Sequence, residues 1–133
     1  MAITALDHIV LNVADVERSL RFFEGVLGLS AERVEAWRTR EIGFPSVRIN
    51  DATLIDLVQA PASESAVRTN LAHFCLVTDD TNLERTVQTL ADHQIPIETG
   101  PAMRWGARGN AQSIYFRDPD NNLIELRAYA TRT

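Results

Sequence analysis

Two short stretches of this chain alternate between apolar and polar positions, as half-buried strands do. In the strand predicted over residues 5–13, His8 shares a face with apolar neighbours, because side chains alternate between the two faces of a strand. In the strand predicted over residues 71–78, His73 lies on a face of the same kind. Each stretch is therefore expected to form a strand that carries one histidine on an apolar face.

A helical pattern follows each of these strands. Asp15 is suited to be an N-cap, and apolar residues then recur at helical spacing until Gly28, which is placed to stop the helix. In the second stretch, Thr81 and Glu84 form a capping box that is expected to open a helix ending near His93. The order strand then helix is thus expected twice.

Further strand patterns complete each half. They cover residues 32–38, 44–49 and 53–59 in the first half and residues 95–98, 112–117 and 123–130 in the second. Each half therefore reads β-α-β-β-β, which predicts the α+β class. In this single domain, residues 1–59 form the first module, residues 60–70 a linker and residues 71–133 the second module.

The two halves also match each other in sequence. The segment around His8 recurs around His73, 65 positions later, and the tetrapeptide that contains Asp56 recurs around Glu125, 69 positions later. The matching residues are Leu6, His8 and Leu11 with Leu71, His73 and Leu76, and Leu54-Ile55-Asp56-Leu57 with Leu123-Ile124-Glu125-Leu126. Two matches in the same order at nearly the same spacing favour a duplicated module over chance.

Composition and charge exclude several classes of protein. The length of 133 residues fits one compact domain that buries a core without disulfides. With 13 Lys+Arg against 18 Asp+Glu and a net charge of -5, nucleic-acid binding is not expected. No apolar run is long enough to span a membrane and no secretory signal is visible, so we expect a cytoplasmic protein. The single cysteine, Cys75, excludes an intramolecular disulfide and a cysteine-rich zinc site.

Four polar side chains fall at matched positions of the two modules. They are two imidazoles and two carboxylates, namely His8, Asp56, His73 and Glu125. A carboxylate among apolar neighbours has to be paired, protonated or bound to a metal. If the modules pack around a pseudo-twofold axis the four converge, and this donor set suits Zn, Fe(II), Mn, Co or Ni rather than Ca. Taken singly, each histidine is more often a structural residue, and each acid a solvent-facing or salt-bridged one.

Four motifs spread over nearly the whole chain resemble one protein family. They are Leu6-Asp7-His8-Ile9-Val10-Leu11-Asn12-Val13, Arg21-Phe22-Phe23 with Val26-Leu27-Gly28-Leu29, Leu71-Ala72-His73, and the segment from Ser113 to Glu125 with its turn Asp118-Pro119-Asp120-Asn121-Asn122. The pattern resembles the vicinal oxygen chelate superfamily, which includes glyoxalase, bleomycin resistance proteins and extradiol dioxygenases. It is most similar to small glyoxalase-domain proteins with a Gly-Ala-Arg-Gly stretch, here residues 106–109.

The resemblance implies a fold and a metal site. Two β-α-β-β-β modules are expected to form a curved, open mixed sheet around a metal cup, with the helices outside. The ligand positions of the family fall on His8, Asp56, His73 and Glu125. Asp56 departs from the pattern, because many relatives have Glu, Gln or His near there and an aspartate reaches about 1.5 Å less far than a glutamate. Direct ligation by Asp56, ligation through water and no ligation all stay open.

This ligand set implies several activities. The leading hypothesis is a divalent-metal-dependent lyase or isomerase whose small substrate chelates the metal through adjacent oxygens, with Glu125 as the first choice of base and Asp56 as the second. If Asp56 does not ligate, the remaining two histidines and one carboxylate favour an Fe(II) extradiol-type dioxygenase, or a thiol transferase acting on an epoxide. A third alternative is a metal-free protein that sequesters a drug-like ligand, as bleomycin-resistance relatives do.

Further residues are candidates for substrate binding. Tyr115 and Arg117 share a strand face near a turn, where a surface role is the alternative. Arg104, Trp105 and Arg108 lie in a glycine-flanked segment that we expect to be a loop, either a lid whose arginines bind a carboxylate or phosphate or simply a solvated loop. The expected partners are a small-molecule substrate and a second copy of the chain in a homodimer, with the site within one chain or shared between two.

Overall fold

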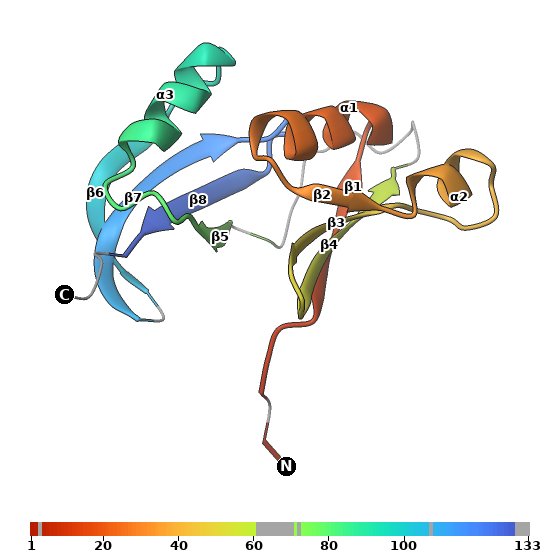
Figure 1. Cartoon of the computed structure of the whole chain (residues 1–133), viewed down its shortest axis with the longest axis horizontal. Helices are drawn as coiled ribbons and strands as arrows, with labels where there is room; N and C mark the ends of the chain where they lie inside the picture. The colour runs from red at the N-terminus through yellow and green to blue at the C-terminus, as the bar shows by residue number, and fades with distance from the viewer. Residues whose placement is uncertain (3, 61–70, 72, 107, 130–133) are drawn as a thin grey trace. The chain divides into compact units, whose positions relative to one another are not determined.

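The structure is a computed structural model that describes residues 1–2, 4–60, 71, 73–106 and 108–129 (Figure 1). The chain divides into two compact units, Met1–Val67 and Arg68–Thr133. The linker expected at residues 60–70 lies almost wholly outside the described residues. Each unit is therefore described by itself.

The first unit is a four-stranded sheet with helices. Its elements in chain order are β1 (His8–Val13), α1 (Val16–Leu20), the π-helical segment η1 (Arg21–Val26), β2 (Ser30–Glu32), α2 (Val34–Arg38), β3 (Ser46–Asn50) and β4 (Thr53–Gln59). The strands lie in the order β1-β4-β3-β2. β1 runs parallel to β4, and the other neighbouring strands are antiparallel.

The second unit repeats this plan. Its elements are β5 (Phe74–Val77), α3 (Glu84–Asp92), β6 (Thr99–Gly106), β7 (Gly109–Arg117) and β8 (Leu123–Ala128), with the strands in the order β5-β8-β7-β6. β5 and β8 are parallel, and the other pairs are antiparallel. The predicted α+β class, with two modules of mixed four-stranded sheet, is confirmed.

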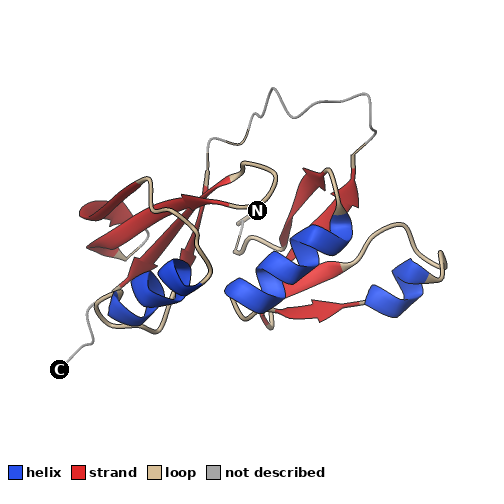
Figure 2. Cartoon of the chain, turned by 90° about the horizontal axis from the view of Figure 1, so that it is seen from above, coloured by secondary structure: helices blue, strands red, loops and turns tan. Residues whose placement is uncertain are grey.

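Each sheet has one face that packs into a core and one that carries the candidate residues. In β4, Ile55 and Leu57 are buried on one face while Asp56 points to the other, and in β8 Ile124 and Glu125 divide in the same way. Helix α3 lies along its own sheet in both views (Figures 1 and 2). Burial of Leu90 from α3 together with apolar side chains of the sheet supplies the main stabilisation of this unit.

The first predicted helix forms over its full length. Asp15 accepts a hydrogen bond from the main-chain N–H of Arg18 at 3.1 Å, as expected of an N-cap. The helix widens into η1, where the N–H of Leu27 donates to the carbonyl of Phe22 at 3.3 Å. Gly28 ends it with a φ of +71°, a conformation that costs glycine little.

Two predicted strands are wrong. The strand expected over residues 32–38 stops at Glu32, because Arg33 has a φ of 63° and the chain then turns into α2. The strand expected over residues 95–98 is a connection after α3, in which the N–H of Ile95 donates to the carbonyl of Leu90 at 2.9 Å. In the first place the residues form a helix themselves, and in the second the chain hydrogen-bonds back to the end of α3, so neither segment forms a strand.

The capping box at the second helix is also wrong. Leu83 occupies the N-cap position of α3 with a φ of 66° and without a side-chain cap, while its own side chain is buried. Asp80 takes the capping role instead, since its Oδ2 accepts from the N–H of Thr86 at 2.9 Å. Burial of Leu83 therefore decides where the helix begins, and Thr81 is left exposed.

The segment expected as a loop or lid forms a β-hairpin. Arg104 and Trp105 belong to β6 and pair with Ala111 and Asn110 of β7. The pairing of β6 with β7 is irregular between Thr99 and Ala102 and continuous from there to Gly106. This segment is therefore a regular part of the sheet up to the turn that precedes Gly109. Among the described residues, no helix is long and apolar enough to cross a membrane.

Candidate metal centre

The first unit brings His8 close to Asp56. His8 opens β1, and Val10 two residues later pairs with Asp56 of β4, so His8 and Asp56 are diagonal neighbours on one face of the sheet. The distance between His8 Nε2 and Asp56 Oδ2 is 3.8 Å. Asp56 is 7% exposed, whereas about half of the His8 side chain is open to solvent.

A second carboxylate orients the His8 ring. Nδ1 lies 2.7 Å from Oδ1 of Asp7. An ionised carboxylate only accepts hydrogen bonds, so Nδ1 is the donor and Nε2 faces Asp56. The hydrogen bond to Asp7 raises the pKa of His8, and the nearby charge of Asp56 adds to it. In neutral His8, Nε2 would carry the lone pair that a metal ion needs.

The second unit brings His73 close to Glu125 in the same way. His73 directly precedes β5, in which Cys75 pairs with Glu125 of β8. His73 Nε2 lies 3.1 Å from Glu125 Oε1. Glu125 is 5% exposed and 40% of the His73 side chain is open to solvent, so both units place a buried acid beside an accessible imidazole.

Each carboxylate is also held by a buried serine. Ser46 Oγ donates to Asp56 Oδ1 at 2.6 Å, and Ser113 Oγ donates to Glu125 Oε2 at 2.7 Å. In each unit the serine binds one carboxylate oxygen and the histidine faces the other. The sequence analysis missed both serines. Their signal was available, because they lie 67 positions apart, close to the spacing of the other repeated residues.

Among the residues that the structure describes, Glu125 has a further partner that Asp56 does not have. Arg127, two residues along β8 and 3% exposed, places Nη1 3.2 Å from Glu125 Oε2. Burial alone would raise the pKa of Glu125, but hydrogen bonds led by that of Ser113, together with the charge of Arg127, hold this pKa below its ordinary value. Glu125 is thus an ionised, buried and multiply bonded carboxylate.

Of the two predicted substrate-binding residues on β7, only Tyr115 lies beside this carboxylate. Tyr115 pairs with Glu125 across the sheet, and its ring centre is 5.7 Å from that of His73. Burial and the interaction with Glu125 raise the pKa of Tyr115. Arg117 instead donates to Glu98 at 2.9 Å and to the carbonyl of Asn121 at 3.0 Å, toward the end of the strand.

The other candidates lie on the β6–β7 hairpin. Arg104 Nη1 donates to the carbonyl of Met103 at 2.9 Å, and the interaction with Arg104 partly opposes the rise in the pKa of Tyr115 that burial and Glu125 cause. The guanidinium carbon of Arg108 lies 4.2 Å from the ring centre of Tyr129, and the main-chain N–H of Arg108 donates to the Tyr129 hydroxyl at 3.0 Å. The side chain of Trp105 lies outside the described part of the structure.

The two His–carboxylate pairs fit a divalent metal in type and in spacing. Two ligand atoms bound to one ion at ordinary lengths lie about 3 to 3.5 Å apart. The His73–Glu125 separation of 3.1 Å falls in that range, and the His8–Asp56 separation of 3.8 Å is slightly wider. Over the described residues, neither unit by itself gathers three or more groups that could hold a metal ion. A complete site would need both pairs, and their convergence stays a prediction.

This fold and donor pattern define the class of protein. A family model described as the Glyoxalase/Bleomycin resistance protein/Dioxygenase superfamily matches residues 5–126. The chain belongs to this superfamily, and the resemblance of its motifs is confirmed. Some relatives in the superfamily are metal-dependent by name.

Curated relatives match over nearly the full chain. The virulence protein STM3117 of Salmonella typhimurium is 35% identical over 97% of this chain and 87% of its own length. The metallothiol transferase FosB of Staphylococcus epidermidis is 30% identical over 95% of this chain and 82% of its own length.

Solved structures share the fold. An integron cassette protein from the mobile metagenome of Vibrio cholerae is 35% identical and has a TM-score of 0.77, covering 98% of each chain. A FosX fosfomycin resistance protein variant from Listeria monocytogenes, in complex with Mn(II) and 1S,2S-dihydroxypropylphosphonic acid, is 21% identical and has a TM-score of 0.72, covering 97% of this chain and 95% of that one. At that identity, the likeness is one of fold alone.

Proposed function

We propose that this protein is a divalent-metal-dependent enzyme that acts on a small substrate with two adjacent metal-binding oxygens. The observation that carries the proposal is the repeated triplet of histidine, buried carboxylate and buried serine, once in each unit. A structural role for one such triplet would need no counterpart in the other unit. Two copies at matched strand positions supply the two imidazoles and two carboxylates of the proposed metal site.

A lyase or isomerase reaction is the activity we propose first. A metal held by His8, His73, Glu125 and Asp56 would act as a Lewis acid on a substrate carbonyl. Glu125 is the proposed base, and it would accept the proton on Oε1 after that oxygen has left the metal, since Ser113 and Arg127 already hold its other oxygen. Asp56 is the second choice of base.

Thiol transfer to an epoxide is the second candidate. Support comes from the similarity to FosB, whose name describes a metallothiol transferase. In this alternative His8, His73 and Glu125 would hold the metal, and Asp56 would not. The wider His8–Asp56 separation of 3.8 Å gives this alternative a basis within the chain. For either reaction, we propose a cytoplasmic homodimer.

Metal analysis of protein purified without chelator tests the proposal. The wild type should contain about one divalent ion per chain, and His73→Ala should lose most of it, because a removed ligand cannot be replaced by water without a loss of affinity. Retention of metal in Asp56→Ala favours the three-ligand site, and loss favours the four-ligand site. If no divalent ion is bound after purification or after titration with Mn, Fe(II), Co, Ni and Zn, the result contradicts the proposal and favours the metal-free drug-binding protein.

Activity assays then separate the reactions. The wild-type protein loaded with the divalent metal is assayed separately with the hemithioacetal of a 2-oxoaldehyde, with an epoxide and a thiol, and with a catechol under oxygen. Turnover of the hemithioacetal supports the first proposal, and consumption of thiol with the epoxide supports the second. Oxygen uptake with the catechol would make the protein a dioxygenase and contradict both.

A further inference from the structure

The two oxygens of Glu125 have different surroundings. Oε1 faces His73 Nε2 at 3.1 Å. Oε2 receives Ser113 Oγ at 2.7 Å and Arg127 Nη1 at 3.2 Å. Because both donors act on the same oxygen, they restrict rotation of the carboxylate and leave Oε1 directed toward the imidazole.

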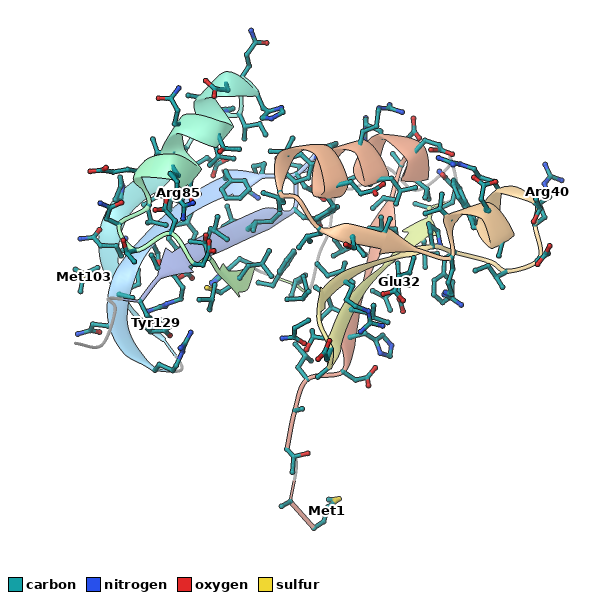
Figure 3. All side chains as sticks on the ribbon, viewed as in Figure 1. Met1, Glu32, Arg40, Arg85, Met103 and Tyr129 are labelled. Atoms are coloured by element: carbon teal, nitrogen blue, oxygen red, sulfur yellow. The ribbon has the colours of Figure 1, made fainter. Side chains whose placement is uncertain are left out.

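Arg127 is itself held in place by the main chain. Its Nη2 donates to the carbonyl of Arg104 at 2.8 Å and to the carbonyl of Gly109 at 3.0 Å, so it bonds to both β6 and β7. Its guanidinium carbon also lies 4.8 Å from the ring centre of Tyr129, which Figure 3 labels close to the end of β8. The planar guanidinium cannot rotate without breaking several of these contacts.

Stability alone does not explain an arginine at this position. A buried ion pair often contributes less to stability than an apolar residue of similar volume. The first unit provides the comparison, because Val58 stands two residues after Asp56 where Arg127 stands two residues after Glu125. The same sheet plan therefore accepts an apolar residue there, and the arginine calls for a different reason.

We propose that Arg127, together with Ser113, is a positioning residue that fixes Glu125 with Oε1 presented beside His73. This inference rests on the proposed function in one respect, namely that Glu125 is a metal ligand. Arg127 touches neither substrate nor metal in this role and acts through the carboxylate. Neither residue was predicted to have a role from the sequence.

Mn(II) affinity provides the first test. Isothermal titration compares the wild type with Arg127→Met, Arg127→Lys and Ser113→Ala, and Val58→Met serves as the matched control in the first unit. Arg127→Met and Ser113→Ala should each weaken Mn(II) binding by about tenfold, as loss of a group that orients a ligand usually does. Arg127→Lys should recover only part of the loss, because an ammonium cannot bond to Glu125 and two carbonyls in one plane. Val58→Met should bind like the wild type.

The sign of the effect separates positioning from simple charge. A cation near the site repels Mn(II), so a purely electrostatic role predicts tighter binding in Arg127→Met and wild-type binding in Arg127→Lys. Unchanged or tighter binding in Arg127→Met, with a wild-type protein that binds Mn(II), overturns the proposal. Thermal unfolding of every variant shows whether it is folded. If Arg127→Met does not fold, Mn(II) binding by Ser113→Ala is the measurement that tests the proposal.

A metal-free measurement keeps the proposal testable if the wild type binds no metal. The ¹⁵N signals of the His73 ring are recorded by NMR at one fixed pH in the apo protein. Arg127→Met and Ser113→Ala should shift or broaden them, because Glu125 would no longer hold one orientation, while Ser46→Ala should alter only the His8 signals. A wild type without metal refutes the proposed function, and unchanged His73 signals in that case refute the positioning role as well.

Discussion

The two units build the same triplet and differ in what surrounds the carboxylate. In the first unit, Asp56 has a serine on one oxygen and a histidine 3.8 Å from the other. In the second unit, Glu125 has a serine, a histidine at 3.1 Å and a buried arginine as well. The added arginine compensates the charge of Glu125 inside the protein. Two similar modules can thus keep the same types of polar side chain while they differ in how firmly each carboxylate is held.

The largest expected loss of stability comes from removing Glu125, and removing Asp56 should cause a much smaller one. Glu125→Ala leaves the buried Arg127 without its anionic partner and should lower the free energy of unfolding by about 3 kcal/mol. Asp56→Ala removes the acceptor of the buried Ser46 hydroxyl, with no buried cation beside it among the described residues, and should cost about 1 kcal/mol. Urea denaturation of the metal-free proteins measures both values. Equal losses would mean that Arg127 does not depend on Glu125.

The ends of the main helices offer a second contrast. The first ends at Gly28 with a φ of 71°, and α3 ends before Gln94, which has a φ of 59°. A side chain in this left-handed region costs about 1 kcal/mol, so Gly28→Ala should destabilise the protein by that amount and Gln94→Gly should stabilise it. Apart from the adjacent chain, no atom of the described residues lies within 4 Å of a Cβ at position 28, so the expected cost comes from backbone strain. Thermal denaturation is the measurement, and a stabilised Gly28→Ala protein would contradict the interpretation.

Helix capping by Asp80 should make stability depend on pH. The N–H of Thr86 holds the pKa of Asp80 below its ordinary value. Because the folded pKa is lower than the unfolded one, the stabilisation is present above about pH 4 and is lost as the pH falls through the folded pKa. Asp80→Ala should therefore be less stable than the wild type by about 1 kcal/mol near neutral pH, and the difference should shrink in acid.

Two variants control for the capping effect. Asp80→Asn keeps a hydrogen-bond acceptor and should retain most of the stability near neutral pH while losing this part of the pH dependence. Asp15→Ala removes the cap of the first helix, whose Oδ1 accepts from Arg18 at 3.1 Å, and should cost a similar amount. Denaturation curves between neutral pH and about pH 3 give the comparison. A constant difference between wild type and Asp80→Ala over that interval would contradict the role of the ionised carboxylate.

The smallest expected effect concerns α2, which has no counterpart between β6 and β7. Arg38 binds Glu17 through Nε at 2.8 Å and Nη2 at 2.9 Å, and it binds Glu35 at 2.9 Å. The groups are partly exposed, so Arg38→Ala should lower the stability only slightly, and the loss should fall further as salt is added. A loss that stays the same in high salt would point to packing of the arginine stem instead.

Local sequence patterns predicted the sheets better than they predicted the helix starts and connections. Strand β4 was expected at residues 53–59 and forms there, because its alternating apolar residues fit one buried face. The capping box at Thr81 failed because burial of Leu83 outweighs a local hydrogen bond. The strand expected over residues 112–117 forms within β7, but β6 and the start of β7 were missed because the glycines and arginines of this segment resemble a loop, and only pairing between the two strands makes it regular.

The sequence by itself determined the duplicated module, the superfamily and the pairing of a histidine with an acid in each half. These follow from residue types at fixed spacing, which any fold of this plan has to place on matched strands. Only the tertiary structure revealed Ser46, Ser113 and Arg127 as partners of the carboxylates. Those contacts join residues on different strands or depend on which sheet face is buried, and neither is encoded by neighbours along the chain.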